Sequence, residues 1–198
     1  MPVTINGNGT ITGVSVGGLP DGIVDTDMLA ANAVSSAKLA SGVGGKVLQV
    51  VQTVKTDTTS TTSASFVDIS GMSRSISFTS GNKVLVEFSA SIGSRYGYPA
   101  FFQLHTNNGV VSGAIGNSSS NRQQCTVGGY IGSWDLQIVR VHFSFLDSPA
   151  DSVTEYKVKW RANSDGNQAI YLNHDWNNQD NVNSPRTISS LTCKEVAA

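Results

Sequence analysis

The chain carries little charge. Only 14% of its 198 residues are charged, against about 25% in a typical soluble domain. The chain has 13 basic and 14 acidic residues, which give a net charge of −1. A chain without a basic excess has no means of neutralising many phosphates, so we expect no nucleic-acid partner. Its polarity comes from Ser, Thr, Asn, Gln and Gly, which suit strands and turns better than exposed helices.

Long apolar runs and leader-like features are also missing. No apolar run approaches the ~20 residues that span a bilayer, so we expect no membrane insertion. The start, Met-Pro-Val-Thr-Ile-Asn, lacks the cationic and apolar regions of a signal peptide, which predicts synthesis in a cytoplasm. The two cysteines, Cys125 and Cys193, fit no metal or redox spacing. They are most simply free thiols on strands, and a disulfide between them is the alternative.

Several motifs of known catalytic and metal sites do not occur. The sequence has no Walker loop, no dinucleotide fingerprint and no His-x-x-x-His pair. Its glutamates on predicted strands stand singly, so nothing pairs them for acid–base chemistry. Catalysis needs a positioned constellation of groups. We therefore expect a protein that is not an enzyme and that needs neither a cofactor nor a metal.

Aromatic residues are absent from the first 45 residues, which hold nine of the twenty glycines. Such a segment cannot bury enough apolar surface to order itself alone. Residues 24–30 and 34–40 share one pattern, which is Val, four variable residues, Leu and Ala. A repeat with so few apolar residues gains a core only by stacking on neighbouring repeats or chains. We predict an extended attachment and trimerisation segment over residues 1–45, and a flexible tether is the alternative. Its apolar contacts would be Val14, Val16, Val24, Leu29, Val34 and Leu39.

From residue 46 onward the pattern has period two. Tyr156, Val158 and Trp160 alternate with charged residues, and the stretches 139–145 and 84–89 alternate in the same way. Further strands are expected near residues 46–55, 65–70, 74–79, 99–105, 109–115, 124–131, 168–173 and 187–196. Short strands separated by turn signals predict an all-β fold, an antiparallel β-sandwich or jelly roll over residues 46–198.

Two polar loops are candidates for a contact surface. In the stretch 173–184, Trp176 can stack on a sugar while His174, Asp175 and Asn177 bond its hydroxyls. Asp175 with Asp180 could instead offer oxygens to calcium, and the simplest alternative is a solvated turn. The stretch 93–99 carries Arg95, Tyr96 and Tyr98, residue types that anchor interfaces, although it could simply connect two sheets.

Several stretches resemble the tail-fibre and related virion proteins of tailed bacteriophages, especially marine and cyanobacterial ones. Residues 11–24 (ITGVSVGGLPDGIV) look like the start of such proteins, and residues 45–52 (GKVLQVVQ) resemble the entry into their C-terminal β domain. Residues 65–71 and 82–86 look like its next strands, and residues 189–196 (SSLTCKEV) resemble the closing strand. The resemblance implies a homotrimer with a jelly-roll head, anchored to another virion protein through its N-terminal portion and exposed on the particle surface.

The sequence therefore favours a structural virion protein, a short trimeric tail fibre or spike that attaches the particle to its host. Two alternatives stay open. One is a capsid (head) fibre or decoration protein, which differs in its location on the particle. The other is a carbohydrate-binding module that recognises a host surface glycan through Trp176 and its loop.

Overall fold

The computed structural model describes residues 4–5, 11–12, 29–31, 33–35, 38, 46–95, 98–130, 137–163 and 168–198. The chain divides into two compact units, Met1–Gly45 and Lys46–Ala198. In the first unit, β1 (Thr4–Ile5) pairs antiparallel with β2 (Ile11–Thr12). Leu29 and Val34 are about half exposed there. The other predicted contacts of this segment, Val14, Val16, Val24 and Leu39, lie outside the described residues.

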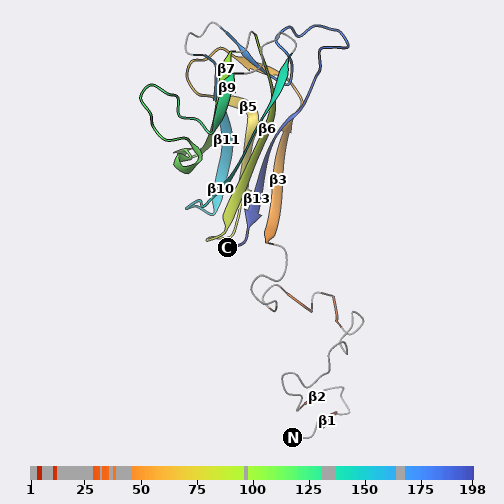
Figure 1. Ribbon diagram of the computed structural model, residues 1–198. Coiled ribbons are helices and arrows are strands. Elements are labelled where there is room, and N and C mark those ends of the chain that lie inside the picture. The colour runs from red at the N-terminus through yellow and green to blue at the C-terminus, as the bar shows by residue number, and fades with distance from the viewer. Residues whose placement is uncertain are drawn as a thin grey trace. The chain divides into compact units, whose positions relative to one another are not determined.

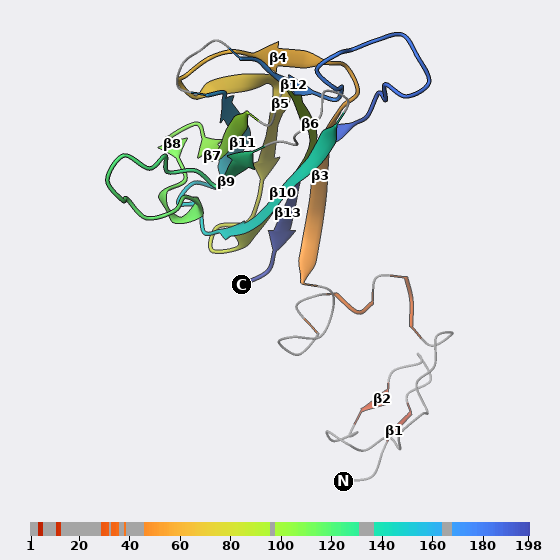
Figure 2. The same ribbon diagram turned by 45° about the horizontal axis from the view of Figure 1, so that its top comes forward.

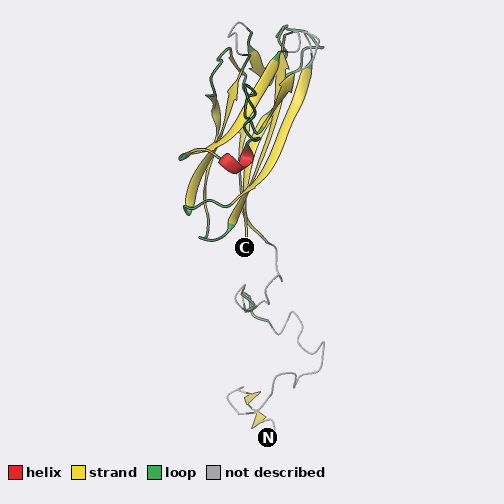
Figure 3. Ribbon diagram, turned by 60° about the vertical axis from the view of Figure 1, so that its left-hand side comes forward, coloured by secondary structure: helices red, strands yellow, loops and turns green. Residues whose placement is uncertain are grey.

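The second unit is built from two antiparallel sheets, which lie as two layers in Figure 3. The first sheet has the order β3-β13-β6-β12-β4, and β10 pairs with the free side of β6. Its strands are β3 (Val47–Lys55), β4 (Thr59–Thr61), β6 (Lys83–Ser94), β10 (Ile138–Asp147), β12 (Ile170–Leu172) and β13 (Ser189–Val196). All of these labels except β12 and β4 can be followed in Figure 1, and Figure 2 adds those two.

The second sheet has the order β5-β11-β7-β8, and β9 pairs with the first half of β7. Its strands are β5 (Val67–Ser77), β7 (Pro99–Thr106), β8 (Gly109–Val110), β9 (Val127–Tyr130) and β11 (Val153–Arg161). Of the ten connections between consecutive strands from β3 to β13, six cross between the sheets. An all-β fold with antiparallel sheets is thus confirmed, and in the second unit a short 3₁₀ turn, Ser112–Ala114, follows β8.

The core lies between the two sheets. The Phe88 ring of β6 lies 5.8 Å from that of Phe102 on β7 and 5.3 Å from that of Phe143 on β10, measured between centroids. Tyr156, Val158 and Trp160, predicted to share one strand face, are all at most 2% exposed. Since alternate residues of a strand face opposite sides, this burial follows directly from the period-two pattern.

One side of the sandwich is closed by side chains. Gln49 Nε2 donates to the carbonyl oxygen of Ser77 at 3.2 Å, and Thr53 Oγ1 donates to that of Ser73 at 2.9 Å. These bonds join the edge strand β3 of one sheet to the edge strand β5 of the other. The unpaired backbone groups that a sheet edge presents are thereby partly satisfied.

Several predicted boundaries were wrong. The expected strands 65–70 and 74–79 are one strand, β5, which is interrupted by a register shift opposite residues 157–159 and contains Gly71 at φ +74°. A glycine in the left-handed region permits such a bulge without ending the strand. The expected strand 109–115 stops at Val110, where the 3₁₀ turn follows. Cys125 and Cys193 are free thiols, as expected, and burial raises the pKa of Cys193 to about 12.

Candidate functional site

The loop between β12 and β13, residues 173–188, is the most prominent polar feature of the sandwich. It is drawn in blue at the end of the sandwich away from residue 46 (Figure 1). Its two ends are tied together, because the Thr187 amide donates to the carbonyl oxygen of Asn173 at 3.1 Å. A loop whose ends meet is a compact unit rather than an open excursion of the chain.

Asn173 fastens this loop to the sheet. Its side chain is fully buried, and its Nδ2 donates to the carbonyl oxygens of Lys55 and Asp57, each at 2.9 Å. Its Oδ1 accepts a hydrogen bond from Ser189 Oγ at 2.6 Å. The residue adopts φ +66°, a left-handed conformation that asparagine tolerates better than most residues. The sharp turn out of β12 therefore depends on this one amide.

His174 and Asp175 point into the loop rather than toward solvent. Asp175 is fully buried, and its Oδ1 accepts from the Asn178 amide at 2.7 Å while its Oδ2 accepts from Ser184 Oγ. His174 is 7% exposed, and its Nδ1 donates to the Asp175 carbonyl oxygen at 2.7 Å. Burial lowers the pKa of His174, which favours the neutral ring. Both side chains, predicted as glycan contacts, are occupied in holding the loop together.

The fold brings the two predicted loops together. The Arg95 guanidinium, which follows β6, lies 4.4 Å from the centroid of the Trp176 ring, a cation–π contact. The pairing of Ile170 with Ser94 on β12 and β6 sets up this approach. Gly93 sits beneath the loop, because a Cβ placed there would lie only 2.4 Å from the carbonyl oxygen of His174. Glycine is thus required for the loop to pack on β6.

The tip of the loop faces solvent. Trp176 is partly buried, whereas Asn177 and the residues that follow it to Asn183 are exposed. Val182 is fully exposed. The sequence did not identify this residue as a candidate, because the loop around it is polar. The Asn183 amide donates to Asn181 Oδ1 at 2.8 Å, a local turn that orders this tip. Of the stretch 93–99, Arg95 and Tyr98 are partly buried, and Tyr96 lies outside the described residues.

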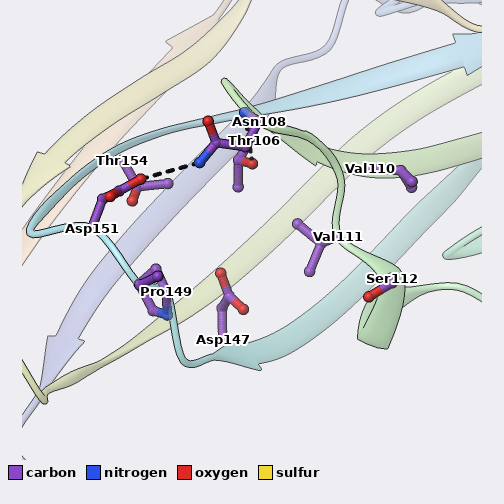
Figure 4. A pocket seen from close by; sticks show the side chains of 10 residues that line it. Thr106, Asn108, Val110, Val111, Ser112, Asp147, Pro149, Asp151 and Thr154 are labelled. Carbon is purple, nitrogen blue, oxygen red and sulfur yellow. Dashed lines mark hydrogen bonds between the residues drawn. The ribbon is translucent and has the colours of Figure 1, made fainter.

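A polar pocket lies at the other end of the sandwich, between the β7–β8 turn and the β10–β11 turn (Figure 4). Asp147 and Asp151 line it. Asp147 Oδ2 accepts from the Tyr156 hydroxyl at 2.7 Å, and Asp151 Oδ2 accepts from Asn108 Nδ2 at 3.1 Å. The Asp151 carboxylate therefore joins two neighbouring turns, and the Asp147 carboxylate joins the end of β10 to β11. Over the residues that the structure describes, no group of three or more His, Cys, Asp or Glu side chains is placed to hold a metal ion.

Comparison with models of known protein families finds no match for this chain, and comparison with curated proteins finds none either. Within the described ranges, no helix has the length and apolar character needed to cross a bilayer.

Proposed function

We propose that the chain is a structural protein of a bacteriophage particle, a short trimeric tail fibre or spike. Residues 1–45 hold the chain to another virion protein and to its sister chains, with Val24, Leu29, Val34 and Leu39 stacked about the axis. The sandwich is a jelly-roll head, exposed on the particle surface, that attaches the particle to its host.

The strand order supports the jelly-roll assignment. In one sheet the first strand of the sandwich, β3, neighbours the last, β13. In the other sheet β5 neighbours β11. Since β4 also pairs with β12, the first three strands pair with the last three in reverse order. This is the order produced when one long antiparallel ribbon wraps into two sheets, as in jelly rolls. Heads of this kind are common in viral proteins, which favours the proposed class without naming a member of it.

The observation that carries the proposal is the separation of the two ends of the sandwich. At one end the chain enters through Lys46, whose carbonyl oxygen accepts from the Ala197 amide at 2.7 Å. At the other end Asn173 ties the polar loop to the last residue of β3, Lys55. The intervening strand β3 spans about 30 Å. A head held at residue 46 therefore presents an ordered, polar, amide-rich loop outward, the arrangement that an attachment protein needs.

Light scattering on the purified chain tests the assembly, and cryo-EM of the particle tests the location. We expect a trimer at micromolar concentration and density for the sandwich projecting from the tail. A monomer contradicts the fibre proposal. Density on the head instead supports the alternative of a capsid fibre or decoration protein.

The contact of Arg95 with Trp176 favours a second candidate function, a carbohydrate-binding module. The cation fixes the indole beside exposed amides such as Asn177, and amides with an aromatic ring form a recurrent surface for sugar recognition. Binding on an array of host surface glycans, lost in Trp176→Ala and Asn177→Ala but kept in Asn108→Ala of the β7–β8 turn, supports this function. Retained binding in the two loop variants refutes it.

A further inference from the structure

The outward side of β3 is unusually apolar for a strand at a sheet edge. Leu48, Val50 and Val54 point away from the core and are 55%, 56% and 48% exposed. Val51, the residue that follows Val50, packs against the core instead. Apolar side chains that gather on an exposed surface mark sites of interaction with other proteins. The outward side of β3 is therefore a candidate interface.

Apolar side chains recur across the sheet along one row of paired residues, with Lys194 among them. Val50 pairs with Lys194 on β13, Lys194 pairs with Leu85 on β6, and Leu85 pairs with Leu146 on β10. Leu146 is 46% exposed. Side chains paired in this way project from the same side of a sheet as neighbours. We call the surface formed by Leu48, Val50, Val54, Leu85 and Leu146 the β3–β10 face.

Lys194, the charged residue among these apolar side chains, is paired within one chain, and Lys83 and Arg140 lie on the same side of the sheet nearer its two ends. Lys194 Nζ lies 2.6 Å from Glu87 Oε2, and both side chains are about one-third exposed. A self-paired charge leaves no net repulsion when the same face meets itself around a symmetry axis. The outward side of the other sheet carries a denser run of charge, since β11 presents Glu155, Lys157 and Lys159 there. The two sheets are therefore unequal candidates for self-association.

The position and size of the β3–β10 face indicate that a second copy of the chain covers it. Leu48 and Val50 follow Lys46 directly, so any association of the preceding residues 1–45 brings the same end of each β3 close together. The exposed fractions correspond to roughly 400 Å² of apolar surface per copy, about half of the ~800 Å² that one partner contributes to a standard interface. Since interfaces are roughly 60% apolar, the face supplies most of the apolar part of one.

We infer that the β3–β10 face is the surface through which the sandwiches of neighbouring copies pack. This inference rests on the proposed trimer and specifies which sheet forms it. The other sheet then faces outward. The Lys194–Glu87 pair is enclosed by the neighbouring copy.

Two matched substitutions in the full chain test the inference. Val50→Glu places a carboxylate in the face, beside Lys194, so the single chain keeps its fold. Val153→Glu is the control, because Val153 begins β11 on the other sheet and is also 56% exposed. Sedimentation velocity over a dilution series measures the trimer midpoint, and thermal unfolding checks folding. We expect Val50→Glu to raise the midpoint concentration at least about tenfold and Val153→Glu to leave it unchanged.

The outcomes separate this inference from the proposal beneath it. A monomeric wild-type chain contradicts both this inference and the proposed trimeric fibre. A trimeric wild type whose midpoint is unchanged by Val50→Glu overturns the inference and leaves the fibre proposal standing. Equal weakening by the two variants also overturns the inference, since the effect is then not specific to one sheet. If Val50→Glu does not fold, Leu146→Glu on β10, at the far edge of the same face, gives the same test.

Discussion

Removing the Asn173 amide should strongly destabilise the sandwich. This buried side chain makes three hydrogen bonds, two donated to backbone carbonyls and one accepted from Ser189. At about 1 kcal/mol each, their loss in Asn173→Gly costs about 3 kcal/mol. Asn173→Ala adds the strain of a non-glycine residue at φ +66°, a further 1 kcal/mol or so. Against a total stability of ~5–15 kcal/mol, these losses are large.

Urea unfolding followed by tryptophan fluorescence measures these free energies, because Trp160 is buried in the core. All variants are compared at one chain concentration, since oligomers unfold in a concentration-dependent way. Asn178→Ala is the control, because Asn178 also adopts a left-handed conformation, φ +47°, but its side chain is exposed. It should lose only about 1 kcal/mol. A loss under 1 kcal/mol in Asn173→Gly, or equal losses in the two alanine variants, refutes the reasoning.

Three further outcomes are expected. Gly93→Ala should cost about 2–3 kcal/mol and loosen the 173–188 loop, seen as faster proteolysis there, because its Cβ would overlap the His174 carbonyl oxygen. Hydrogen bonds from the Thr79 amide and Asn82 lower the pKa of Glu195, so the ionised carboxylate stabilises the fold at pH 7, and this stabilisation is lost as pH falls below about 4.5. In urea unfolding, Glu195→Gln should therefore be less stable than the wild type at pH 7 and should lose less stability between pH 7 and pH 3. Deleting residues 1–44 should leave a cooperatively unfolding sandwich with unchanged far-ultraviolet circular dichroism, and a non-cooperative transition contradicts this.

The sequence predicted strands well where one side faces the core. In β11, Tyr156, Val158 and Trp160 alternate with charged residues, and burial follows that pattern residue by residue. Prediction failed at β5, where a bulge at Gly71 carries the strand through a stretch that reads as a break. Period-two patterns depend on a regular pleat, and a bulge shifts the phase without leaving a distinct signal.

The site was harder to predict than the strands. Arg95 and Trp176 are distant in sequence, and their contact depends on the pairing of β12 with β6, which no local pattern encodes. His174 and Asp175 belong to a stretch so polar that solvent exposure was the natural expectation. Their burial is explained by hydrogen bonds within the loop itself. Composition reports polarity, but not whether the polar groups are satisfied by water or by each other.

The strand that enters the sandwich at Lys46 also determines how the domain bears mechanical load. β3 pairs with β13 from Val47↔Val196 to Lys55↔Ser189, and the polar loop is tied to the far end of that ladder. Hydrogen bonds between antiparallel strands run perpendicular to the strands. A force applied between residue 46 and the loop therefore acts along β3 and shears the whole ladder at once, instead of opening it one bond at a time. Under the proposed function, a particle holds one end of the sandwich and a cell the other, and this is the direction in which the sandwich resists tension best.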